Sequence, residues 1–339
     1  MKANASPFRP AVVVPLLAMM ISSGSVAFSI EPPVTALAFT SDGNFLVAGS
    51  QAGVLCYAWP DLTHPRAVET HVANVQDLAF SPDQCFLAIA GGQPAESGLC
   101  EIIAWPEGHT VRTLEDHQDL VSSVTWARSS NTIATASMDT KVVITTLQRA
   151  VRTSQNETPP TSSASLTVQS QHRLLGHSKG VLAVRFLPNA PLVLTAGIDQ
   201  SIRVWQWAPP EPRLLRTLEN HTEAVYALAL RPTQDDALPI VTSIGDDRTV
   251  RLWQPTIGRM MRFARLDDVV PLSAQWQPDG SQIIVGCSDG HVRSIDPDTT
   301  EVVTDTPVQS GWCYSLAIHP QTGVIVVGGP DGVKKVLQD

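Results

Sequence analysis

The chain has 339 residues, of which 43% are hydrophobic and 16% are charged, and this composition excludes a disordered polypeptide. The formal net charge is −9 and the sequence shows no cluster of Lys and Arg. Nucleic acid is therefore not an expected partner, because a protein that binds phosphates needs clustered positive charge. Aromatic residues make up only 6% of the chain, while Val, Ala, Thr and Ser are plentiful, which favours many short strands over long amphipathic helices.

Residues 1–24 are predicted to form a secretory signal peptide. Two basic residues precede an apolar run from Ala11 to Ile21, and small residues follow it. The run is about half of the ~20 residues that a membrane-spanning helix needs, and Pro15 interrupts it, so a stable membrane span is not expected. We predict cleavage near residues 24–27 and a secreted or periplasmic protein. A cytoplasmic protein is the alternative.

Seven similar segments recur from residue 34 onward. Each is a six-residue, mostly apolar stretch, and the last residues of successive segments lie 41 to 60 positions apart. Turns rich in Pro, Asp and Gly follow the segments, and a period of about 40 to 45 residues with four strands per unit is typical of propeller blades. The sequence therefore predicts an all-β domain over residues 25–339, a seven-bladed β-propeller of four-stranded antiparallel blades. The segments are VTALAF (34–39), VQDLAF (75–80), VSSVTW (121–126), VLAVRF (181–186), VYALAL (225–230), PLSAQW (271–276) and CYSLAI (313–318).

Two of the seven units contain a complete set of four polar side chains, a His, a hydroxyl residue, an Asp and a Trp. With the Gly-His pair that opens the fourth unit, they resemble the WD-repeat (WD40) family. The resemblance implies a hydrogen-bonded chain in which Asp accepts from His, His meets the hydroxyl, and the hydroxyl meets the indole. Because the set occurs in two units, we interpret it as structural and not as a nucleophilic triad. The two sets are His177, Thr195, Asp199 and Trp205, and His221, Ser243, Asp247 and Trp253.

The other units keep only parts of this set. The third has Thr where Trp is expected, the second keeps its His without a matching Asp, and the first, sixth and seventh have lost the His. The remaining members are His71, His117, Thr135, Asp139, Asp289 and Asp331.

Two segments depart from the regular repeat. Residues 149–171 are rich in Ser, Thr, Pro and Gln, and we predict a flexible inserted loop there. The seventh unit ends after its third strand, so its fourth strand is expected from residues 24–28, which lie at the offset of an outer strand. Cleavage after Gly24 leaves that strand intact.

No catalytic residue, metal site or cofactor is predicted. The sequence has no His-Glu-x-x-His, no phosphate-binding glycine loop and no Cys-x-x-Cys. Its five cysteines are an odd number without close pairs, and most of them lie in apolar runs where a thiol is a small hydrophobe. Their disulfide state stays open. They are Cys56, Cys85, Cys100, Cys287 and Cys313.

We therefore expect a non-catalytic, monomeric scaffold that binds a protein or peptide on its top face. This face is formed by the loops between one blade's outer strand and the next blade's inner strand, and by the turns between second and third strands. Trp312 is the strongest candidate because large aromatics dominate binding hot spots, although it could instead plug the central channel. The alternative is an exported enzyme or carbohydrate-binding module that uses the channel, near Asp267 and Asp268. The candidate binding residues are Asn74, Asp119, Lys179, Glu223, Tyr226, Trp312 and Tyr314.

Overall fold

The computed structural model describes residues 32–129, 131–150, 165–208, 211–232 and 238–336. Within these ranges the chain forms strands and turns, and no helix there has the length and apolar character needed to cross a bilayer. Residues 31–339 form one compact unit. The predicted signal peptide and the predicted strand at residues 24–28 lie outside the described residues.

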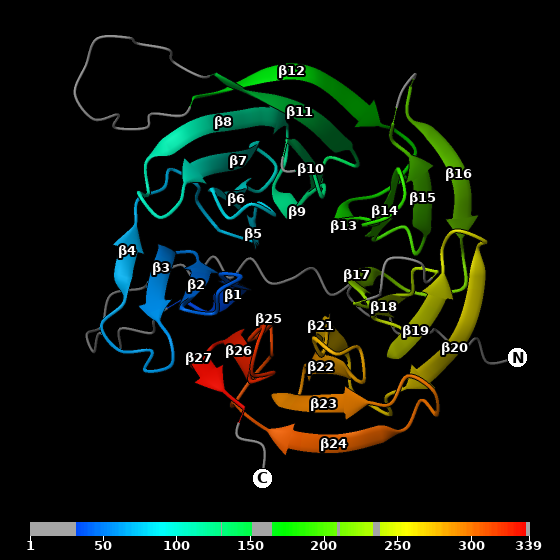
Figure 1. The fold of residues 1–339 in the computed structure, drawn as a ribbon. Coiled ribbons are helices and arrows are strands. Elements are labelled where there is room, and N and C mark those ends of the chain that lie inside the picture. The colour runs from blue at the N-terminus through cyan, green and yellow to red at the C-terminus, as the bar shows by residue number, and fades with distance from the viewer. Residues whose placement is uncertain (1–31, 130, 151–164, 209–210, 233–237, 337–339) are drawn as a thin grey trace, which may run out of the picture. The chain divides into compact units, whose positions relative to one another are not determined.

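The strands form seven antiparallel sheets arranged around an axis (Figure 1). In each sheet the strands follow chain order from the axis outward, and we call the sheets blades 1 to 7. Blades 1 to 6 have four strands and blade 7 has three among the described residues. Blade 1 contains β1 (Val34–Phe39), β2 (Phe45–Ser50), β3 (Gly53–Ala58) and β4 (Arg66–Val68); blade 2 contains β5 (Asp77–Phe80), β6 (Phe86–Gln93), β7 (Ser97–Ala104) and β8 (Thr110–His117); blade 3 contains β9 (Val121–Trp126), β10 (Thr132–Ser137), β11 (Val142–Ala150) and β12 (Ser165–Leu174); blade 4 contains β13 (Val181–Phe186), β14 (Leu192–Gly197), β15 (Ile202–Gln206) and β16 (Arg213–Leu218); blade 5 contains β17 (Val225–Leu230), β18 (Val241–Gly245), β19 (Thr249–Gln254) and β20 (Arg259–Arg265); blade 6 contains β21 (Pro271–Trp276), β22 (Ile283–Cys287), β23 (His291–Ile295) and β24 (Val302–Pro307); blade 7 contains β25 (Ser315–Ile318), β26 (Ile325–Gly329) and β27 (Gly332–Lys335).

Burial within a blade falls from the axis toward the rim. In blade 4 every residue of the second strand, β14, is buried, whereas in β16 at the rim only Leu218 is buried. A second strand is covered on both faces by the neighbouring blades, and a strand of this kind needs a continuous apolar run and not an alternating one. The sequence LVLTAG of β14 meets this requirement.

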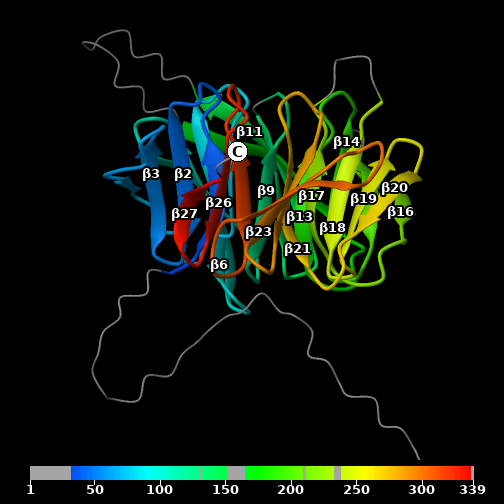
Figure 2. The same ribbon diagram turned by 90° about the horizontal axis from the view of Figure 1, so that it is seen from below.

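The hydrophobic core is divided into seven clusters, and each cluster contains residues of two neighbouring blades. The inner strands contact one another in sequence around the axis, and β1 contacts β25, which closes the ring (Figure 1). The ring is seen from its side in Figure 2. The cluster between blades 7 and 1 is the smallest, with Leu46, Ala317 and Val326 as its buried members. Among the described residues this junction therefore has the fewest fully buried core members, although partly buried residues such as Phe39 and Trp59 pack against it.

The predicted fold is confirmed: the chain is all-β, with seven blades of antiparallel strands. The predicted inserted loop is wrong at its boundaries, because Arg149 ends β11 and residues 165–171 belong to β12, which pairs with β11. Leu166 is buried in the core between blades 2 and 3. The loop was predicted from composition, which does not register that Leu166 and Val168 alternate with polar neighbours. Such alternation is typical of a strand.

Strand β27 is the last strand of blade 7 among the described residues, and its edge gives the first testable prediction. A variant that starts at residue 21 keeps the segment 24–28 and should melt like the full chain. A variant that starts at residue 31 removes the predicted fourth strand from the thinnest junction of the ring. Its free energy of unfolding should fall by about 2 kcal/mol or more, which lowers the melting temperature by about 3 °C or more for a chain of this size. Equal melting temperatures of the two variants, measured by circular dichroism, would show that residues 24–28 do not complete blade 7.

Candidate functional site

The four polar side chains of blade 4 form one chain of hydrogen bonds. The Trp205 Nε1 donates to Thr195 Oγ1 at 2.9 Å, Thr195 Oγ1 lies 2.7 Å from His177 Nε2, and His177 Nδ1 lies 3.0 Å from each carboxylate oxygen of Asp199. An indole N–H can only donate, so the Thr195 hydroxyl donates to His177 Nε2, and the imidazole donates from Nδ1 to the carboxylate. All four side chains are buried. We call such a set a clamp.

The same clamp occurs in blade 5 and, without its indole, in blade 3. In blade 5 the Trp253–Ser243, Ser243–His221 and His221–Asp247 distances are 2.8, 2.6 and 2.9 Å. In blade 3, His117 lies 2.9 Å from Thr135 and 3.1 Å from Asp139, and Thr145 stands in the place of Trp.

The clamp carboxylate also holds backbone. Asp199 accepts from the backbone N–H of Ser178 at 3.1 Å, in the loop that leads to the inner strand, and from that of Ser201 at 3.2 Å in its own turn. The carboxylate therefore ties this loop to the turn between the second and third strands. Equivalent loop bonds join Gln118 to Asp139 at 3.1 Å, Thr222 to Asp247 at 3.2 Å and Ser310 to Asp331 at 2.8 Å.

Blade 2 makes the same connection with a residue that the sequence analysis missed. Glu101, in the third strand β7, is almost fully buried and accepts from the His71 backbone N–H at 2.8 Å and from His71 Nδ1 at 3.0 Å. The hydroxyls of Thr70 and Thr110 donate to it at 2.6 and 2.5 Å. The available indication was a single Glu inside the apolar strand SGLCEIIA, since a buried carboxylate must be paired.

The clamps shift the acidity of their carboxylates. Burial is the largest single influence on Asp139, Asp199 and Asp247 and opposes their ionisation. The hydrogen bond from the clamp His, the charge of that His and the hydrogen bonds from the loop and turn together outweigh burial and lower the pKa of each carboxyl, that of Asp139 to about 2. Burial likewise opposes ionisation of Glu101, and the hydrogen bonds from Thr110, Thr70 and His71 lower its pKa. These four carboxylates are stabilised as anions by the fold.

The clamp cannot act as a nucleophilic triad. Thr195 is completely buried, and its hydroxyl already bonds His177 and Trp205. A nucleophile must reach its substrate, and this one is enclosed by the strands of blade 4. The arrangement holds loops in place and offers no reacting group at the surface.

The side chains of two predicted binding residues make hydrogen bonds to nearby backbone groups. Asn74 has a positive φ of 48° and donates from Nδ2 to the Gly92 carbonyl at 3.0 Å. Asp119 accepts from the backbone N–H groups of Ala95 at 2.6 Å and Leu120 at 2.7 Å. Both side chains shape the loops of the top face, whereas Lys179 and Glu223 are exposed.

The predicted aromatic residues lie around the start of the inner strands. Trp312 and Tyr314 are half-buried, and their ring centroids are 5.8 Å apart. Tyr226 and Tyr314 line a cavity of about 140 Å³ in the central channel, together with residues of all seven inner strands, and Trp312 is not among its lining residues. Burial raises the pKa of both tyrosines. The structure thus places Tyr226 and Tyr314 at the channel cavity and Trp312 against Tyr314, outside the lining.

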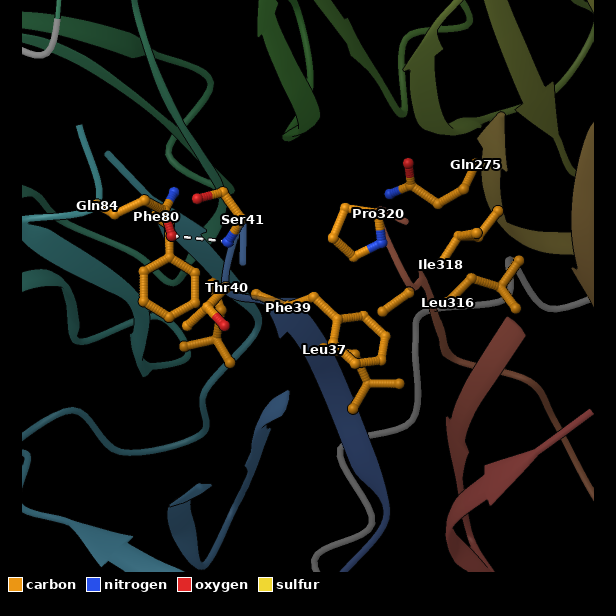
Figure 3. Close-up of a pocket in the computed structure, with 13 residues that line it drawn as sticks. Leu37, Phe39, Thr40, Ser41, Phe80, Gln84, Gln275, Leu316, Ile318 and Pro320 are labelled. Atoms are coloured by element: carbon orange, nitrogen blue, oxygen red, sulfur yellow. Dashed lines mark hydrogen bonds between the residues drawn. The ribbon is translucent and has the colours of Figure 1, made fainter. Parts of the chain in front are cut away.

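A second cavity of about 380 Å³ lies at the other end of the inner strands, beside blades 6, 7, 1 and 2 (Figure 3). Phe39, Phe80, Leu37 and Ile318 line it, and the backbone N–H of Ser41 donates to the Gln84 side chain at its edge. It occupies the junction where the core is thinnest. The sequence analysis did not predict this pocket, because its lining comes from four blades at the two ends of the chain.

The acidic residues and cysteines considered for a catalytic or metal site do not lie together around a common point. Asp267 and Asp268 are exposed, neither lines the channel cavity, and Asp268 pairs with Arg248 at 2.9 Å. Among the described residues no group of three or more His, Cys, Asp or Glu side chains could hold a metal ion. The five cysteines are free thiols, and all but Cys85 are buried.

A ring of seven like blades with buried clamps defines a repeat propeller, and comparison with known sequences identifies its family. The model described as "WD domain, G-beta repeat" matches residues 25–57, 108–145, 168–206 and 212–254, and the "Anaphase-promoting complex subunit 4 WD40 domain" matches residues 265–319. The chain belongs to the WD-repeat family. The predicted resemblance is confirmed.

The individual proteins that the chain resembles share about a quarter to a third of their residues with it over the matched regions. Mouse coronin-7 is 34% identical over 123 residues, 34% of this chain and 12% of that protein; human striatin-4 is 31% identical over 153 residues, 42% and 19%; and the Dictyostelium discoideum periodic tryptophan protein 2 homolog is 23% identical over 270 residues, 78% and 26%. The chain thus spans only 12–26% of the length of these relatives. The solved WD40 β-propeller domain of Doa1 has a TM-score of 0.71 at 18% identity, covering 91% of this chain and 94% of that one, and supports the fold.

The prediction of a secreted or periplasmic protein is wrong. Coronin-7, striatin-4, the periodic tryptophan protein 2 homolog and THO complex subunit 3 of Arabidopsis thaliana are cytoplasmic or nuclear proteins. The first matched repeat starts at residue 25, so the small and apolar residues that resemble the end of a cleavage region belong to the repeat. Their alternation suits a strand as well as it suits a signal peptide.

Removal of one clamp histidine tests its structural role. His177→Ala leaves Thr195 and Asp199 buried without their partner, which should lower the free energy of unfolding by about 1–3 kcal/mol. Urea denaturation measures this change. The exposed His109, changed to Ala, is the matched control and should have little effect. An unchanged stability of the His177 variant would contradict the structural role of the clamp.

The lowered pKa values predict how stability depends on pH. A carboxylate whose pKa is lower in the folded state stabilises the fold above its ordinary pKa, and that contribution is lost as the pH falls through the folded pKa. For Asp139, Asp199 and Asp247 the loss begins near the ordinary value of 3.8 and continues to about 2 or below.

Stability should therefore fall steeply below about pH 4. An Asp199→Asn variant should be less stable at pH 6 and should lose less stability between pH 6 and pH 2. Asp267→Asn, at an exposed site, should keep the steep profile. Parallel profiles of the parent and the Asp199 variant, followed by chemical denaturation, would refute the assignment.

Proposed function

We propose that this chain is a non-catalytic scaffold that binds a protein or peptide through its top face. The observation that carries the proposal is the half-exposed Trp312, which lies against Tyr314 at the channel. A partly exposed aromatic that already packs against a neighbouring ring loses little conformational freedom on binding, which is a property of hot-spot residues.

Family membership supports the general part of this proposal. WD-repeat proteins bind protein partners, and the related coronin, striatin, periodic tryptophan protein 2 and THO complex proteins act as interaction scaffolds. The position of the binding surface on this chain is the specific part of the proposal. Its support is the rigidity of the loops, because clamp carboxylates hold the backbone of three of them, and Asp331 and Glu101 hold two more.

The exposed charges on this face give the proposed surface its selectivity. Lys179 and Glu223 stand in the corresponding loops of blades 4 and 5 and have opposite charge. Neither is used in an ion pair within the described part of the chain. They are available to orient a partner whose apolar anchor rests on Trp312.

Substitution of Trp312 tests this proposal. Trp312→Ala should weaken capture of partner proteins from a cell extract by about tenfold or more, since a hot-spot aromatic contributes about 2 kcal/mol or more, and it should leave the melting temperature within a few degrees of the parent. Phe45→Ala removes an exposed aromatic that is 38% accessible at the opposite end of the blade, and serves as the control. Unchanged capture by the Trp312 variant, or capture lost equally in the Phe45 variant, would contradict a top-face site.

A further inference from the structure

The outer strands of blades 4 and 5 carry most of the positive charge on the rim. Strand β16 has the sequence RLLRTL and β20 has the sequence RMMRFAR, so together they contain five Arg and no acidic residue. The other outer strands are β4, RAV; β8, TVRTLEDH; β12, SLTVQSQHRL; and β24, VVTDTP. None of these has more than one basic residue in excess of its acidic residues. The whole chain has a net charge of −9, so this concentration is local.

The two strands are the outer strands of neighbouring blades, and we call their exposed surface the arginine rim. A Cβ on Gly258, in the turn before β20, would lie 2.8 Å from Cδ of Arg216 on β16. Arg216 pairs with Val204, which packs in the core between blades 4 and 5, so its side chain faces blade 5. On β20, Phe263 pairs with Arg251 and shares its face of the sheet. The two blades thus present Arg216 and Phe263 toward one another at the rim.

Most of this positive charge has no partner inside the protein. Within the described residues, Arg216, Arg259 and Arg265 have no carboxylate oxygen within 4 Å, and the pair Arg262–Asp298, at 3.4 Å, joins two exposed side chains. Arg213 donates to the neutral Gln206 at 2.9 Å.

The arginine rim also has the apolar and backbone groups that an extended chain requires. Phe263 is 49% exposed, and the Arg251 guanidinium lies 5.5 Å from its ring centroid. In blade 5, β20 pairs with β19 and is the last strand of its sheet. Its outer edge therefore offers backbone N–H and C=O groups at alternate positions, which is the geometry that accepts an added strand.

From these observations we propose that the arginine rim binds an acidic peptide in extended conformation, added as a fifth strand to blade 5. Side chains of an added strand point alternately to the two faces of the sheet. One set meets Phe263, Arg265 and Arg216, and the other set meets Arg259 and Arg262. The fitting ligand is a segment in which Asp or Glu alternates with apolar residues. This site is separate from the top face and goes beyond the proposed function.

The test uses three labelled decapeptides and fluorescence anisotropy with the full chain. A peptide of alternating Glu and Val should bind, and its affinity should fall with rising salt. A peptide of alternating Glu and Pro has the same charge but lacks half of the backbone N–H groups, and it should bind at least fivefold more weakly. A peptide of alternating Lys and Val should not bind.

The variant R259Q/R262Q/R265Q should lose at least tenfold in affinity for the Glu-Val peptide. Since all three side chains are exposed, the fold should be retained, and the melting temperature verifies this. Arg173→Gln on the outer strand of blade 3 is the control and should bind as the parent does. Trp312→Ala should also bind normally, so failure of the top-face site and failure of the rim are distinguishable.

Several outcomes would overturn the proposal. Equal binding of the Glu-Val and Glu-Pro peptides would show attraction by charge without strand addition. Preference for a single-stranded oligonucleotide or for anionic vesicles over the peptide would assign the rim to another polyanion. Absence of peptide binding, with self-association of the triple variant in sedimentation experiments, would show that the arginines only protect an exposed sheet edge.

Discussion

The fold depends on the burial of each blade against its neighbours. Every apolar cluster joins residues of two adjacent blades, so a single blade has no complete core of its own. Burial of apolar surface is the dominant favourable term in folding, and here it is available only when the ring is closed. The junction of blades 7 and 1 must therefore form although its core is the smallest. The pocket lined by Phe39 and Ile318 lies at this junction, and sparse packing is the reason that space is left there.

The polar clamps solve a different problem, the satisfaction of backbone groups in the loops. A loop that turns back toward the axis has N–H groups without strand partners, and a buried unpaired donor is costly. The carboxylates of Asp199, Asp331 and Glu101 each accept from such a group. Asp199 is also bonded to a His and Asp331 to a Ser hydroxyl, and both lie in the turn between the second and third strands. Glu101 lies in the third strand itself. Blades 2, 3 and 7 thus keep the carboxylate contact although their motif is incomplete. In blade 6 the loop N–H of Val270 donates instead to the Ser288 hydroxyl, and Asp289 bonds Arg293. This is why loss of the family motif in a blade does not imply a loose loop.

The features that could be predicted depend on residues close together in the sequence, whereas those that were missed depend on residues far apart in it. The number of blades and most inner strands follow from a local period and from turn residues, and segments such as VLAVRF coincide with the observed strand β13. The role of Glu101 could not be assigned, because its partner His71 is 30 residues away and belongs to no known spacing. The arginine rim was missed for a similar reason. Its five Arg residues are divided between two segments more than 40 positions apart, so no cluster of positive charge exists in the sequence. The prediction of export was wrong for a different reason: a short strand and a cleavage region contain the same small and apolar residues.

The architecture separates stability from recognition. Core residues and clamps occupy the inner three strands and the buried sides of the loops, while loop tips and outer strands carry little of the apolar core; β20 contributes Ala264 and part of Met260 and Met261. Substitutions at the loop tips and on the rim therefore change the surface without opening the junctions between blades. A rigid ring can in this way hold two chemically different surfaces, an aromatic one at the channel around Trp312 and a basic one on the edge of blade 5. Each surface inherits its rigidity from the same seven junctions, and neither depends on the other.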